Sequence, residues 1–141
     1  MAIDDIVVNM ASAAANPTSI TNITQTPVSP VTSAQTVSVS ADVTDADGIN
    51  SVNLIWGTAS GNLTNTPIAM NAGTGSTYTT STSIPAQAAG ATVFYEIEVT
   101  DNNTPANVTT SAEQSYDVLK NEPTNHVSGF TATANGSSQI D

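Results

Sequence analysis

The chain has 141 residues and a formal net charge of −11, which comes from 12 Asp and Glu residues against a single Lys or Arg. Nucleic acids are bound through clusters of Lys and Arg, so this composition excludes DNA and RNA as partners. The absence of cysteine excludes disulfides and thiol catalysis, and we expect no membrane insertion because no apolar run approaches the ~20 residues that span a bilayer.

The first elements along the chain are an apolar strand and a linker. Residues Ile3–Val8 form a short apolar run, and the small residues that follow it are typical of a linker. We therefore interpret residues 1–16 as an N-terminal strand and linker that belong to a preceding domain. A further short strand is expected at Ser19–Thr26, ahead of two prolines that break strands, Pro27 and Pro30.

The two clearest strands follow one another in the middle of the chain. Residues Thr36–Asp45 alternate apolar and polar side chains, and one face carries Val37, Val39, Ala41 and Val43. Residues Ser51–Gly57 alternate in the same way, and one face carries Val52, Leu54 and Trp56. A period of two is typical of a strand with one buried face, and the segment Asp45–Gly48 between the two strands has the composition of a turn.

Further strands complete the pattern. We expect them at Pro67–Met70, Gly75–Ile84, Ala91–Asp101 and Asn107–Leu119, with a hairpin turn at Gly73–Gly75. About seven short strands separated by Gly, Pro, Asn and Asp, without a long helical pattern, predict an all-β fold. The expected architecture is an antiparallel two-sheet sandwich that occupies residues 17–119.

The C-terminal residues 120–141 have a linker composition followed by a strand-like run, Val127–Ala134. We interpret them as a linker and the first strand of a following module. A strand without a partner exposes its backbone unless it adds to the edge of a sheet. The terminal runs Ile3–Val8 and Val127–Ala134 are therefore candidates for strand exchange.

Three segments carry a resemblance to a known family, namely Thr36–Gly48, Val52–Gly57 and Phe94–Asp101. Residues 17–119 resemble the immunoglobulin-like (Ig-like) and fibronectin type III-like modules that occur in tandem in large secreted proteins of polymer-degrading bacteria. The tail Glu122–Ala134 resembles the opening strand of a following fibronectin type III-like module, and Ile3–Val8 resembles the last strand of a preceding jelly-roll domain. The resemblance implies an Ig-like fold, a secreted or cell-surface location, and neighbouring domains of the parent chain as partners.

The sharpest candidate site is acidic. In a sandwich of this topology, the loop between the two clearest strands and the loop before the last strand lie at the same end. We expect this end to gather four carboxylates, those of Asp42, Asp45, Asp47 and Asp101, with Asn102 and Asn103 as further oxygen donors. Oxygen ligands of this kind suit calcium. The alternative is structural, with Asp45 and Asp47 in Asx-turns and Asp101 at a strand end.

No pattern in the sequence specifies an enzyme. Glu96 and Glu98 lie two residues apart on one face of a strand, whereas glycoside hydrolysis needs two carboxyl groups on opposite sides of a cleft. We therefore expect no catalytic residue.

The aromatic residues bear on carbohydrate binding. Trp56 shares the apolar face of its strand and is expected in the core. Tyr95 resembles the tyrosine-corner residue of Ig-like domains, whose hydroxyl bonds to nearby backbone. Phe94 is the ring that points outward, so it is the candidate contact for a sugar.

These expectations define two functions. The first is a non-catalytic Ig-like spacer or adhesion module of a larger extracellular bacterial protein, which a calcium ion would stiffen. The alternative is a carbohydrate-binding module that targets an attached polysaccharide-degrading enzyme, with polysaccharide or cell-surface glycans as partners.

Overall fold

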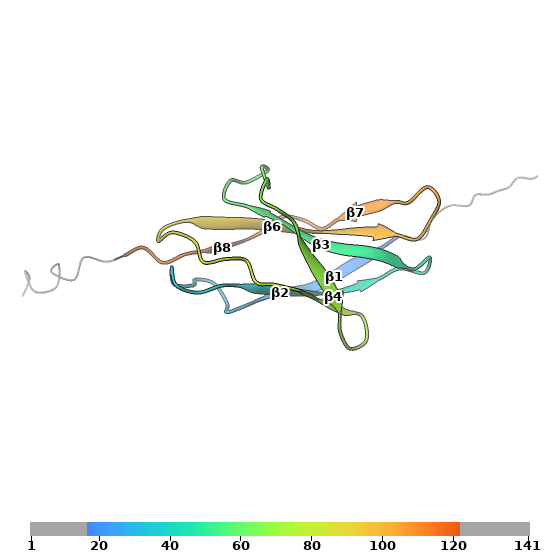
Figure 1. Ribbon diagram of the computed structural model, residues 1–141, viewed down its shortest axis with the longest axis horizontal. Helices are drawn as coiled ribbons and strands as arrows, with labels where there is room; N and C mark the ends of the chain where they lie inside the picture. The colour runs from blue at the N-terminus through green and yellow to red at the C-terminus, as the bar shows by residue number, and fades with distance from the viewer. Residues whose placement is uncertain (1–16, 122–141) are drawn as a thin grey trace, which may run out of the picture.

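The computed structural model describes residues 17–121, which form eight strands with antiparallel pairing. The strands are β1 (Ser19–Thr26), β2 (Ser38–Thr44), β3 (Ile49–Gly57), β4 (Ile68–Ala72), β5 (Thr77–Thr80), β6 (Thr92–Asp101), β7 (Val108–Thr110) and β8 (Gln114–Asp117). They make one open sheet in the order β1-β2-β5-β4-β3-β6-β7, and β8 pairs with β6 (Figure 1). The predicted all-β antiparallel fold is confirmed.

The sheet curls so strongly that β1 and β2 lie opposite β3 and β6 (Figure 1). Alternate residues of β2, β3 and β6 are buried, as the period of two in their sequences predicts. Their inward faces enclose one apolar core, which contains Val37, Val39, Ala41, Val43, Val52, Leu54, Trp56, Val93, Tyr95, Ile97 and Val99. Burial of this apolar surface is the main stabilising term of the fold.

Strand β4 makes the sheet continuous. Its first residues pair with β3, where Ile68 lies opposite Leu54. Its last residues pair with β5, where Met70 lies opposite Thr80. The strand crosses the gap between the two halves of the curled sheet (Figure 1), so hydrogen bonding continues from one half to the other. The strands therefore form one continuous curled sheet, where two separate sheets were expected.

The first described segment of the chain, β1 and the residues after it up to Val31, contacts both halves of the curled sheet. β1 pairs with β2, with an irregular register between Thr21 and Thr24, where Asn22 has a φ of 50°. The chain then crosses to the other half, where Val31 forms an isolated parallel bridge with Val118. Both segments that lead to the chain ends are thus tied to the sheet.

Most predicted strands match the observed ones closely, and Ser19–Thr26 matches β1. The predicted strand Gly75–Ile84 shortens to β5, and the predicted strand Asn107–Leu119 divides into β7 and β8, both paired with β6. The expected turn at Gly73–Gly75 joins β4 to β5 in a hairpin. Ile3–Val8 and Val127–Ala134 lie outside the described residues.

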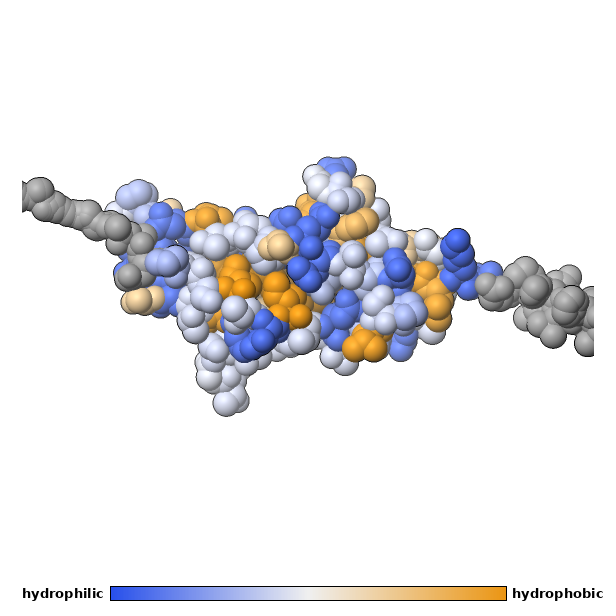
Figure 2. All heavy atoms as spheres, turned by 180° about the vertical axis from the view of Figure 1, so that it is seen from behind, coloured by the Kyte–Doolittle hydropathy of each residue, from blue (hydrophilic) through white to orange (hydrophobic). Residues whose placement is uncertain are grey.

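The surface of the described part is polar with small apolar patches. Seen from behind, apolar side chains reach the surface in groups bordered by polar ones (Figure 2). The large apolar side chains that are most exposed are those of Val28, Val108 and Leu119. Among residues 17–121, no helix has the length and apolar character to cross a membrane.

Candidate functional site

Three carboxylates meet at one end of the curled sheet. Asp45 and Asp47 lie in the turn between β2 and β3, and Asp101 is the last residue of β6. Each contributes an oxygen atom, and these oxygens lie within 4.8 Å of one another. Asp101 is buried, with 1% of its surface exposed, whereas Asp45 and Asp47 are half-buried. We call these three residues the acidic cluster.

The turn that carries Asp45 and Asp47 is held by its own hydrogen bonds. The backbone N–H of Asp47 donates to Oδ1 of Asp45 at 2.7 Å, which is an Asx-turn, and the N–H of Gly48 donates to the carbonyl oxygen of Asp45 at 3.2 Å. Gly48 has a φ of +92°, which a side chain disfavours, and a Cβ there would lie 2.7 Å from Nδ2 of Asn102. Glycine therefore allows this turn to approach the loop after β6.

Asp101 organises the loop between β6 and β7. Its Oδ1 accepts the backbone N–H of Asn103 at 3.0 Å and that of Asn107 at 2.8 Å. Its Oδ2 accepts the side-chain amides of the same two asparagines, each at 2.8 Å. Each carboxylate oxygen thus accepts two hydrogen bonds. These bonds stabilise the ionised form of Asp101, which burial would otherwise disfavour.

These donors lower the pKa of the Asp101 carboxyl from 3.8 to about 2. The backbone N–H of Asn107 is the largest cause, while burial acts in the opposite direction. Hydrogen bonds to the ionised form therefore outweigh desolvation, and Asp101 is charged at neutral pH.

No basic side chain of residues 17–121 lies beside the acidic cluster. Lys120 is the single Lys or Arg of the chain. It follows β8, whose last residue pairs with the first residue of β6, whereas Asp101 is the last residue of β6, so about 30 Å of strand lies between the two positions. Hydrogen-bond donors from backbone N–H groups, side-chain amides and the hydroxyl of Thr18 face the carboxylates of the cluster.

The cluster includes three of the four predicted metal ligands. Asp42 is not among them, because it lies on the outward face of β2, between the buried Ala41 and Val43. There Oδ2 of Asp42 accepts Nδ2 of Asn22 and Oδ1 accepts the hydroxyl of Thr77, each at 2.8 Å. The bond from Asn22 is the largest cause of the lowered pKa of Asp42.

The two asparagines expected as oxygen donors have other roles. Asn103 directs its amide nitrogen at the cluster, since Nδ2 donates to Oδ2 of Asp101 and also to Oδ2 of Asp47 at 3.2 Å. Asn102 joins the two loops through its backbone N–H, which donates to the carbonyl oxygen of Gly48 at 3.1 Å. In this arrangement the hydrogen-bond donors of Asn103 face the carboxylates.

Two residues that hydrogen-bond to the acidic cluster were not predicted from the sequence. The hydroxyl of Thr18 donates to Oδ2 of Asp45, which ties the start of the described chain to the cluster. Asn107 bonds to Asp101 from six residues away. The run of Asp, Asn and Pro between residues 101 and 107 indicated a turn, but its spacing gave no pairing for Asn107.

The aromatic expectations are met in part. Trp56 lies in the core with 7% of its surface exposed, and its Nε1 donates to the carbonyl oxygen of Thr66 at 3.1 Å. Tyr95 is also buried, but its hydroxyl donates to a side chain, Oε1 of Gln25 at 3.4 Å, rather than to nearby backbone. Phe94 is half-buried on the outward face of β6.

Glu96 and Glu98 occupy the same outward face of β6 as Phe94, and both are half-buried. They lie opposite Ile55 and Asn53 of the neighbouring strand. Each stands between buried residues that point to the other side of the sheet, so the strand itself separates both carboxylates from the core.

Comparison with known proteins adds no relative: the chain matches no protein-family model, no curated protein and no solved structure.

Proposed function

We propose that the chain is a non-catalytic spacer or adhesion module of the Ig-like, fibronectin type III-like kind, part of a larger secreted or cell-surface protein. In this proposal the half formed by β1, β2 and β5 and the half formed by β3, β6, β7 and β8 act as the two sheets of a sandwich. The apolar core between them supports it, as does a composition rich in Ser, Thr and Asn with few charged residues.

One observation carries the spacer role. The described chain begins at the end that holds the acidic cluster, where Thr18 bonds to Asp45, and it ends after β8 at the opposite end of the long axis (Figure 1). Because the chain enters the module at one end and leaves it at the other, domains attached to the two ends would be separated by the length of the module. Pairing of β1 with β2 and of Val31 with Val118 resists separation of the two ends, because tension along the strands loads these hydrogen bonds in shear.

The spacer role predicts cooperative resistance to tension. When the full chain is held by its termini in a single-molecule pulling experiment, we expect residues 17–121 to unfold in one step that releases about 300 Å of chain. Val31→Ala should lower the unfolding force because Val31 is buried at the bridge to Val118, whereas Val28→Ala, at a position that is 74% exposed, should not. Gradual lengthening at low force, without a step, would argue against a spacer.

We further propose that the acidic cluster holds a calcium ion that stiffens this end. Ligands on opposite sides of calcium are about 4.6 to 5.2 Å apart, so carboxylate oxygens within 4.8 Å of one another suit it. Binding requires the side chain of Asn103 to turn, so that Oδ1 faces the ion in place of Nδ2.

Calcium should therefore raise the melting temperature of the chain. At a free calcium concentration of about 100 times Kd, binding adds about 2.7 kcal/mol, which corresponds to roughly 10 °C for a module of this size. The double variant Asp45→Asn/Asp47→Asn should lose the response, because it keeps turn-forming side chains but removes two carboxylates. Asp42→Asn, which lies outside the cluster, should retain it. Equal melting temperatures in calcium and in chelator, measured by circular dichroism, would exclude the ion.

A further inference from the structure

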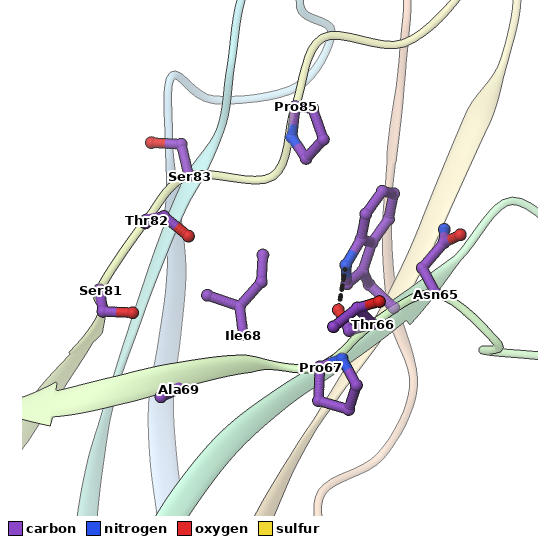
Figure 3. Close-up of a pocket in the computed structure, with 10 residues that line it drawn as sticks. Asn65, Thr66, Pro67, Ile68, Ala69, Ser81, Thr82, Ser83 and Pro85 are labelled. Atoms are coloured by element: carbon purple, nitrogen blue, oxygen red, sulfur yellow. Dashed lines mark hydrogen bonds between the residues drawn. The ribbon is translucent and has the colours of Figure 1, made fainter.

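A solvent-open groove of about 630 Å³ lies on the side of the sheet where β4 crosses between the two halves. Its volume falls within the range of ~300–1,000 Å³ that is typical of small-molecule sites. Figure 3 shows Ile68 between the segment Ser81–Ser83 on one side and Thr66 and Asn65 on the other. Pro67, Ala69, Pro85 and the indole of Trp56 complete the lining.

The groove exists because β4 changes partner. Its last residues pair with β5, whereas Ile68 pairs with β3 and the chain before it stays beside β3, where the N–H of Asn65 donates to the carbonyl oxygen of Trp56 at 3.1 Å. After Ser81, whose N–H donates to the carbonyl oxygen of Ala69, the chain that follows β5 runs on toward Pro85. Pro67 and Pro85 have no backbone N–H, so neither can donate to a strand laid between the two walls.

The groove is uncharged although the chain is strongly acidic. None of its lining residues has an ionisable side chain, while the whole chain carries a formal charge of −11. Its rims offer hydroxyl groups and one amide, from Thr66, Ser81, Thr82, Ser83 and Asn65. Between them lie the apolar side chains of Ile68, Pro67 and Pro85 and the small part of Trp56 that is exposed, 7% of its surface. The result is an apolar floor with neutral hydrogen-bonding rims.

We propose that this groove binds a neutral saccharide chain. A sugar ring presents apolar C–H faces, which suit the floor, and a circle of hydroxyls, which suit the Ser, Thr and Asn rims. Charge selects a neutral ligand, because the net negative potential of the chain disfavours acidic polysaccharides and the groove has no carboxylate for a cation. An extended peptide fits less well, since Pro67 and Pro85 remove donors that strand addition uses. The site is separate from Phe94 and independent of the spacer role.

Trp56 provides the signal for a direct test, because it is the single tryptophan of the chain and it lines the groove. The full chain is titrated with neutral gluco-, manno- and xylo-oligosaccharides and, as a charged control, with oligogalacturonate, while tryptophan fluorescence is recorded. We expect a saturable change with at least one neutral oligosaccharide and none with oligogalacturonate. If no neutral oligosaccharide gives saturation, or if oligogalacturonate binds as well, the proposal is wrong.

Matched variants locate the site. Thr82→Ala/Ser83→Ala removes two exposed groove hydroxyls and should weaken binding roughly tenfold or more. Thr110→Ala/Ser115→Ala removes two exposed hydroxyls from β7 and β8, and it should leave binding unchanged. Phe94→Ala should also leave binding unchanged.

Loss of binding in Phe94→Ala would contradict saccharide binding in the groove and would place the site on the outward face of β6. Unchanged binding in Thr82→Ala/Ser83→Ala would overturn it as well. Neither result alters the unfolding step under tension, so failure of the saccharide site and failure of the spacer role are distinguishable.

Discussion

Replacing Leu54 with alanine is expected to lower the free energy of unfolding by about 3 to 5 kcal/mol. Leu54 has no exposed surface and lies in β3 opposite Ile97, which is also fully buried. Truncation removes apolar contacts and leaves a cavity that the closely packed halves of the sheet fill only in part. Because small domains are stable by only about 5 to 15 kcal/mol, this variant should lose a large fraction of its stability in urea unfolding followed by circular dichroism.

Leu119→Ala is the matched control for this substitution. Leu119 is 48% exposed beyond β8, so the same change in chemistry should cost about 0.5 kcal/mol or less. Similar losses at both positions would contradict a single dry core enclosed by the curled sheet.

Replacing Asp101 with alanine is expected to lower the melting temperature by roughly 10 °C. The change leaves the backbone N–H groups and the side-chain amides of Asn103 and Asn107 without their acceptor, and it opens the loop after β6. Asp101→Asn keeps the size of the side chain and one carbonyl oxygen, so about half of the loss should remain. Differential scanning calorimetry of both variants measures the effect.

The same carboxylate gives the protein a specific sensitivity to acid. The pKa of Asp101 lies at about 2 when folded and at 3.8 for an ordinary aspartate, so the unfolded chain takes up this proton first as the pH falls. The stability that the ionised group contributes is complete above pH 3.8 and is lost between pH 3.8 and about 2. Asp42 and Glu113, whose pKa values are also lowered, act in the same direction.

Asp101→Asn should therefore flatten the dependence of the melting temperature on pH within this window. Asp42→Ala serves as the control for a surface carboxylate, and it should lower the melting temperature by only about 2 °C, because its two hydrogen bonds are to exposed or half-buried side chains. If the slope of Asp101→Asn below pH 3.8 equals that of the unmodified chain, the lowered pKa of Asp101 does not govern acid unfolding.

The acidic cluster shows which features of the site could be predicted from the local sequence and which depend on tertiary contacts. The alternation of side chains along β2 places Asp42 on the face opposite Ala41 and Val43. Its position outside the cluster could therefore have been predicted from the sequence. The turn chemistry of Asp45 and Asp47 was also visible in the sequence. The loop that Asp101 closes with Asn107 was not, because many backbone paths can connect two residues six apart in a turn-rich segment.

By itself the sequence determined most of the strands, the buried faces of β2, β3 and β6, and the turns at Asp45–Gly48 and Gly73–Gly75, because side-chain alternation and turn chemistry are properties of adjacent residues. Tertiary structure alone decided that β4 joins the two halves into one curled sheet, that Val31 pairs with Val118, and that an uncharged groove opens beside Ile68. These features depend on which strands become neighbours, and pairing between residues far apart in the chain leaves no periodic signal in either segment.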